Sequence, residues 1–110
     1  MNRFFLMLLT LCMLSPLARA QSPAPSKVDM AFNKWYTYDD MTQSLRALVR
    51  AYPNLLQMES LGKSVGDRDI WLVTLNDPET GPPESKTAMY IEGNIHGNEI
   101  QATEAVLYTI

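Results

Sequence analysis

The chain has 110 residues, with 9 basic and 12 acidic side chains and a formal net charge of −3, and its length fits one small domain. It contains no cluster of basic residues that would neutralise phosphates, so we expect no nucleic-acid partner. Its one cysteine, Cys12, excludes a disulfide within the chain.

The first twenty residues have the pattern of a secretory signal peptide. Arg3 gives a cationic start, residues 4–14 form an apolar run with one threonine, and the Ala-Arg-Ala that ends at Ala20 puts small residues at a cleavage site. The run has 11 residues, against roughly 20 needed to cross a bilayer as a helix, so we expect no stable membrane anchor. An uncleaved signal anchor is the alternative. We therefore expect an exported protein, either periplasmic or extracellular.

Cleavage after Ala20 changes both the size and the charge of the exported chain. It leaves 90 of the 110 residues and removes Cys12. The formal net charge becomes −5, because two arginines leave and all 12 acidic residues stay. The exported chain then holds no disulfide, even in a compartment that permits them.

An extended lead-in and a first helix are predicted next. Residues 21–34 carry two prolines and two serines with little apolar periodicity, which favours an extended segment. Thr37 is the predicted N-cap of the helix, with Asp40 three residues later in the pattern of a capping box. Apolar residues then recur at helical spacing until Pro53 ends the helix. They are Met41, Leu45, Leu48, Val49 and Tyr52.

The remaining chain predicts three strands and a second helix. Strands are expected at residues 55–61 and 69–76, and the second is apolar on both faces, which favours a place inside a covered sheet. A surface loop with three prolines follows, and residues 87–94 predict a third strand. From Glu99 onward a helical apolar pattern continues to the last residue without a stop signal. We therefore expect the chain to be an incomplete copy of a larger domain.

The stretch GNIHGNEIQATEA, at the junction of the third strand and the second helix, contains the candidate metal site. It holds His96, the only histidine, and Glu99 three residues later. Zinc takes nitrogen and oxygen ligands at about 2.0 to 2.2 Å, and residues three apart in a turn can both reach one ion. Gly93 and Gly97 flank the pair and permit a sharp bend and a close approach. The alternative is a simple turn histidine beside a carboxylate that the helix dipole favours, since two ligands do not make a site.

Other polar or aromatic residues receive structural interpretations. Arg68 is expected to be a turn residue or a salt-bridge partner, and Trp71 is expected in the core. Glu92 and Glu104 are candidates for acid or base chemistry. Glu104 falls off the helical face of Glu99, so we expect solvated or supporting roles for both.

The segment GNIHGNE, between a strand and an apolar helix, resembles the zinc-ligand segment of the metallocarboxypeptidases, the carboxypeptidase A-like zinc peptidases. Residues 38–77 also resemble the family's opening helix, its Tyr-Pro stop and its strand pair. The resemblance implies an α/β fold with a mixed β-sheet flanked by helices, truncated in this chain. In that division, residues 1–20 are the signal peptide, 21–34 the lead-in and 35–110 the incomplete N-terminal portion of the catalytic domain.

The resemblance also implies a site and a reaction. His96 and Glu99 match the first two Zn²⁺ ligands, and the third ligand and the general base are expected downstream of Ile110. The implied reaction is zinc-dependent hydrolysis at or near the C-terminus of a peptide or protein, with cell-wall peptides among the open substrates. Asn98 stands where digestive members carry arginine and is a candidate substrate-binding residue. The 110-residue chain alone is expected to be inactive.

One departure from the family pattern and two rival functions remain. The family usually has glycine directly before arginine in the hairpin turn, whereas Asp67 separates Gly66 from Arg68 here, so an altered turn is expected. Aspartoacylase and succinylglutamate desuccinylase enzymes share the histidine and glutamate spacing, but the export signal and the opening helix argue against them. A catalytically inactive binding relative is the second alternative.

Overall fold

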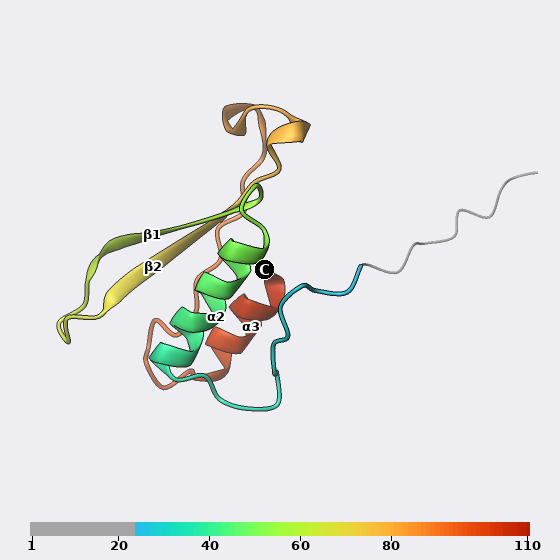
Figure 1. The fold of residues 1–110 in the computed structure, drawn as a ribbon. Helices are drawn as coiled ribbons and strands as arrows, with labels where there is room; N and C mark the ends of the chain where they lie inside the picture. The colour runs from blue at the N-terminus through green and yellow to red at the C-terminus, as the bar shows by residue number, and fades with distance from the viewer. Residues whose placement is uncertain (1–23) are drawn as a thin grey trace, which may run out of the picture.

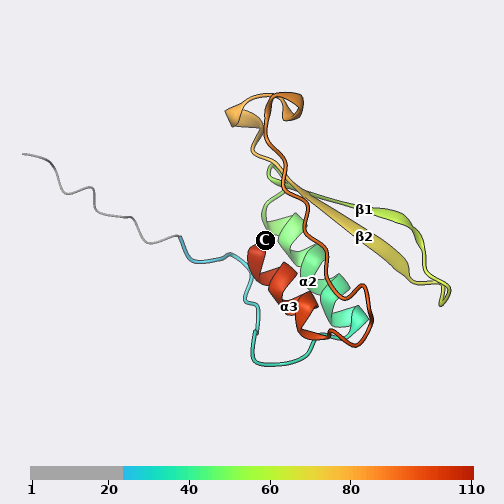
Figure 2. The ribbon, with the colours of Figure 1, turned by 180° about the vertical axis from the view of Figure 1, so that it is seen from behind.

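The computed structural model describes residues 24–110, in which two helices and a two-stranded sheet form an α/β arrangement (Figure 1). Helix α2 (Tyr38–Ala51) leads into strands β1 (Leu56–Lys63) and β2 (Asp69–Leu75), and helix α3 (Gln101–Thr109) comes last. The two helices lie side by side, and the strand pair extends away from them (Figures 1 and 2). The predicted signal peptide lies outside the described residues.

Helix α2 begins and ends where the sequence predicts. The Thr37 hydroxyl accepts a hydrogen bond from the Asp40 backbone N–H at 3.1 Å, and the Asp40 carboxylate accepts from the Thr37 N–H and hydroxyl, which completes the capping box. The bond from the Thr37 hydroxyl is the main reason that the pKa of Asp40 lies below its ordinary value, and the bond from the Thr37 N–H adds to this effect. Pro53 follows the last turn, and Leu45 and Leu48 of the predicted apolar face are buried.

Strands β1 and β2 form an antiparallel hairpin in which Leu56 pairs with Leu75. In its turn the Ser64 N–H donates to the Arg68 carbonyl at 2.8 Å, and the Asp67 N–H donates to the Ser64 carbonyl at 2.9 Å. Asp67 adopts a positive φ of 59°, a conformation that aspartate tolerates better than most residues other than glycine. The extra residue between Gly66 and Arg68 is thus accommodated by a left-handed backbone within the turn.

The sheet is smaller and more open than the sequence predicts. Residues 87–94 were expected to form a third strand, and this prediction is wrong for this structure because they have no regular secondary structure. A strand needs the hydrogen bonds of a neighbour, and no strand among residues 24–110 supplies them. The prediction that β2 lies inside a covered sheet also fails, since Ile70 is 50% and Leu75 is 59% exposed.

The loop between β2 and the unpaired segment is an ordered surface loop, as predicted. It contains the short 3-10 helices η1 (Pro78–Thr80) and η2 (Pro83–Ser85). The Lys86 ammonium closes it by donating to the Asn76 side chain at 2.7 Å. From there the chain returns along the molecule to the start of α3 (Figure 2).

A small apolar core lies where α2, β1 and α3 meet. Leu45, Leu48, Leu56 and Leu107 are each at most 5% exposed. Because β1 begins at this core, its first residues pack directly against α2. None of the helices in residues 24–110 has the length and apolar character that crossing a membrane requires.

Candidate metal centre

The His96 and Glu99 side chains meet in the turn that precedes α3. The Nδ1 atom of His96 lies 3.1 Å from Oε1 of Glu99. Both side chains are open to solvent, at 73% and 52% exposed. The Gly97 N–H donates to the Asn94 carbonyl at 3.1 Å and the Asn98 N–H to the His96 carbonyl at 2.7 Å, which makes the turn tight. A tight turn therefore brings the two predicted ligands to one side.

The two flanking glycines serve this geometry in different ways. Gly97 has a φ of 67° and open space around it, so its role is to permit a left-handed turn. Gly93 lies against α3, where an added Cβ would stand 2.7 Å from the Ala102 carbonyl oxygen. The expectation of a sharp bend and a close approach is confirmed, with one glycine responsible for each.

The donor types of the pair fit a zinc ion. The 3.1 Å between His96 Nδ1 and Glu99 Oε1 is the distance of a hydrogen bond between the two side chains, and it places both donor atoms within reach of one ion. Imidazole nitrogen and carboxylate oxygen are both zinc ligands. No cluster of three or more potential metal ligands is present among residues 24–110, so the described part supplies two donors.

The remaining predicted residues near the turn lie in two environments. Asn98, the predicted substrate-binding residue, is exposed to solvent next to Glu99 in the sequence. The Glu92 carboxylate accepts a hydrogen bond from the Tyr90 hydroxyl at 2.9 Å, and this bond raises the pKa of Tyr90. Glu104 is half-buried, and its Oε1 accepts from the Tyr36 backbone N–H at 2.9 Å. Glu104 is therefore bound to the segment before α2, and no sequence pattern indicated this partner 68 positions earlier.

Residues of the hairpin contact α2. Trp71 is half-buried rather than fully in the core, and its Nε1 donates to the Thr42 hydroxyl at 3.0 Å. Arg68 belongs to the hairpin turn, one of its two predicted roles, and its guanidinium lies 5.3 Å from the centroid of the Tyr38 ring in a cation–π contact. These contacts fasten the hairpin to α2 and place Arg68 in a structural role.

Comparison with known sequences identifies the family. A sequence model of zinc carboxypeptidases matches residues 41–110, well over half of the chain. The chain belongs to the zinc carboxypeptidase family. Carboxypeptidase D of Mus musculus is 36% identical over 83 residues, covering 74% of this chain and 6% of that protein. The carboxypeptidase N catalytic chain of Rattus norvegicus is 30% identical over 73 residues, covering 66% of this chain and 16% of that protein.

An inactive relative belongs to the same group of matches. The inactive metallocarboxypeptidase of Saccharomyces cerevisiae is 30% identical over 96 residues, covering 86% of this chain and 22% of that protein. This zinc carboxypeptidase chain therefore spans less than a quarter of the length of each of these three relatives. The resemblance based on GNIHGNE and the hairpin is confirmed, and the matched region contains His96 and Glu99.

Proposed function

We propose that this chain contributes the first two zinc ligands, His96 and Glu99, to a metallocarboxypeptidase. The observation that carries the proposal is the 3.1 Å separation of His96 Nδ1 and Glu99 Oε1 in an exposed turn before α3. Membership of the zinc carboxypeptidase family supports a zinc ion as the bound group. The complete domain then has the mixed sheet between helices that the family resemblance implies.

In this proposal the residues of this chain orient and hold the metal. His96 donates through Nδ1 and Glu99 through Oε1, and the bonds across Gly97 and Asn98 keep both atoms on one side of the turn. A zinc ion held by these residues would lower the pKa of a bound water and polarise a carbonyl group. Because both ligands are exposed, there is room beside them for a third protein ligand, a general base and the substrate. We propose that residues downstream of Ile110 supply the third ligand and the base.

The proposed substrates are peptide or protein C-termini, since the family acts on such ends. Asn98 lies next to Glu99 on the exposed turn and is the proposed substrate contact of this chain. Cell-wall peptides are a further substrate class for an exported enzyme. Export through residues 1–20 to the periplasm or the cell exterior, without a stable membrane anchor, completes the proposal.

An inactive binding relative is the second candidate function. It is favoured by the 30% identity to a yeast protein named as an inactive metallocarboxypeptidase. In that case His96 and Glu99 either bind a metal that no general base uses, or serve only to stabilise the turn. The aspartoacylase-like alternative has weaker support, because the matching family model is that of zinc carboxypeptidases.

The test measures zinc content and peptidase activity in the intact protein that carries this sequence. His96→Ala and Glu99→Gln should each lower zinc affinity by at least tenfold and abolish release of C-terminal residues from peptides. Glu84→Gln, on the surface loop, is the matched control and should change neither quantity. Full activity in His96→Ala would contradict the proposed ligand role. Zinc binding without any hydrolysis would instead favour the inactive relative.

A further inference from the structure

Helix α3, which follows the metal-binding turn, has little intrinsic support. It has nine residues, and its N-cap residue Ile100 makes no side-chain capping bond. Isolated helices shorter than about 12 residues are marginal in water, so α3 depends on its contacts with other segments. An apolar pocket of about 380 Å³ lies beside α3, and Phe32 from the segment before α2, Leu48 of α2 and Tyr108 of α3 are among the residues that line it.

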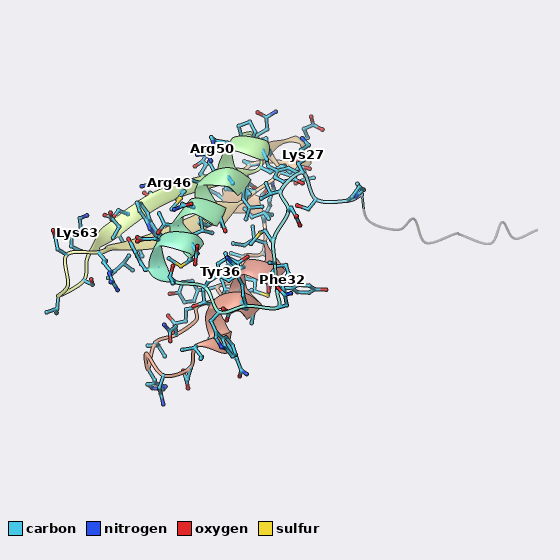
Figure 3. The ribbon with its side chains drawn as sticks, turned by 60° about the horizontal axis from the view of Figure 1, so that its bottom comes forward. Lys27, Phe32, Tyr36, Arg46, Arg50 and Lys63 are labelled. Carbon is cyan, nitrogen blue, oxygen red and sulfur yellow. The ribbon has the colours of Figure 1, made fainter. Side chains whose placement is uncertain are left out.

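The segment before α2 supplies the missing contacts. We call residues 27–36 the strap. One end is fixed to the end of α2, where the Lys27 N–H donates to the Tyr52 hydroxyl at 2.7 Å. From Phe32 onward the strap lies alongside α3 (Figure 3), and the Phe32 and Tyr108 rings meet edge to face at 5.2 Å between centroids. The strap therefore joins both helices, and the predicted extended lead-in is extended but not free.

The strongest contact of the strap with α3 is its bond to Glu104. The Tyr36 N–H donates to Glu104 Oε1 at 2.9 Å in a part-buried site, and a charged acceptor makes such a bond stronger than a neutral one. Glu104 Oε2 is also buried and has no hydrogen-bond partner among residues 24–110. Burying this oxygen costs free energy, so the Tyr36 bond and the surrounding contacts must offset that cost.

Glu104 is connected to the metal-binding turn through the backbone of α3. The Ala102 N–H donates to the Glu99 carbonyl at 2.9 Å, which ties the turn to the first residues of the helix. Gly93, on the chain entering the turn, is packed against the Ala102 carbonyl. Any rotation of α3 about its axis would therefore move Glu99 relative to His96. The Tyr36 bond opposes this rotation because it fixes the first turn of α3 from outside.

We propose that Glu104 is a positioning residue, which, with the Phe32 contact, holds α3 so that His96 and Glu99 face one metal ion. This inference rests on the proposed zinc role of those two ligands. Glu104 does not contact the metal in this arrangement. It acts through the strap, a segment 68 positions away in sequence.

The test uses Glu104→Ala, Glu104→Gln and Phe32→Ala in the intact protein. Hydrogen exchange reports on residues 93–109 and, separately, on α2, and chelator competition gives the Kd for Zn²⁺. Glu104→Ala should speed exchange in residues 93–109 and weaken zinc binding, each by roughly tenfold or more, because it removes a hydrogen bond to a charged group. Glu104→Gln keeps an acceptor oxygen, so it should restore both quantities to within about threefold of the original protein.

Controls separate a positioning role from a general loss of stability. Glu59→Ala on the exposed face of β1 and Trp35→Ala, a strap residue that is 58% exposed, should change neither readout. Exchange in α2 should stay unchanged in every variant. Phe32→Ala should change residues 93–109 in the same direction as Glu104→Ala, and it decides the question if Glu104→Ala does not fold.

Two outcomes overturn the proposal. One is unchanged exchange and zinc affinity in both Glu104→Ala and Phe32→Ala, and the other is an equal loss in α2 and residues 93–109. Absence of zinc binding by the original protein would refute the metal function separately, and the exchange measurements would still test the strap.

Discussion

Gly93 and Gly97 show at the scale of single residues how the proposed metal-binding turn is built. A Cβ at Gly93 would meet the Ala102 carbonyl oxygen at 2.7 Å, whereas a Cβ at Gly97 would enter open space. Gly97 instead has a φ of 67°, a backbone conformation that residues other than glycine, asparagine and aspartate rarely adopt. The first position is limited by space, and the second by backbone conformation.

This difference predicts that alanine and asparagine variants rank in opposite order of stability at the two positions. Gly93→Ala should lower the free energy of unfolding by about 1 to 3 kcal/mol through overpacking, and Gly93→Asn by at least as much. Gly97→Ala should cost about 1 to 2 kcal/mol, whereas Gly97→Asn should cost less, because asparagine tolerates the left-handed conformation. Urea denaturation of the metal-free intact protein measures all four variants. A Gly97→Asn variant less stable than Gly97→Ala would show that the turn adopts another backbone in solution.

Helix α2 is the element whose boundaries follow most directly from local chemistry. Its capping box joins Thr37 and Asp40 in both directions, and these bonds lower the pKa of the Asp40 carboxyl. A carboxyl with a lowered folded-state pKa stabilises the fold fully above its ordinary value. That contribution is lost as the pH falls through the folded pKa.

The predicted consequence is an acid dependence that Asp40→Asn removes. The difference in unfolding free energy between the original protein and Asp40→Asn should be constant near neutral pH and shrink as the pH falls below 4, since the ordinary value of this carboxyl is 3.8. Because the group is solvent-exposed, the change should be small. Denaturation series at several pH values measure it, with Asp39→Asn as the control in the same turn. A difference that does not change on acidification would mean that the Asp40 carboxylate makes no capping bonds.

Of the three predicted strands, only the third failed to form. The apolar pattern of residues 87–94 is typical of a strand, yet the segment has no regular structure. Helix α2 closes its hydrogen bonds within 14 residues of its own sequence, whereas a strand needs a partner from elsewhere. Strands β1 and β2 formed because each is the other's partner across a short turn.

Metal binding should stabilise the whole molecule. If His96 and Glu99 bind zinc in the folded state alone, free zinc at 100 times its Kd should raise the free energy of unfolding by about 2.7 kcal/mol. Thermal denaturation of the intact protein, before and after chelation, should show a lower midpoint without zinc. His96→Ala should melt at one temperature in both conditions. An equal zinc effect in the original protein and in His96→Ala would place the metal elsewhere.

The sequence by itself determined the features that depend on neighbouring residues. These are the cap and stop of α2, the hairpin, the proline-rich loop and the turn that places His96 beside Glu99. The spacing of three residues and the flanking glycines were sufficient to predict that His96 and Glu99 share one turn, because both features are local in the sequence.

Only the tertiary structure revealed the contacts between distant segments. The Tyr36 bond to Glu104 joins a backbone N–H, which every residue except proline carries, to a carboxylate in an amphipathic helix, and neither leaves a pattern in the sequence. The close approach of Gly93 to α3 and the open edge of β2 are likewise decided by where other segments lie. Hydrogen bonds between neighbouring residues form the turn of His96 and Glu99, whereas packing between remote parts of the chain places the helix that follows it.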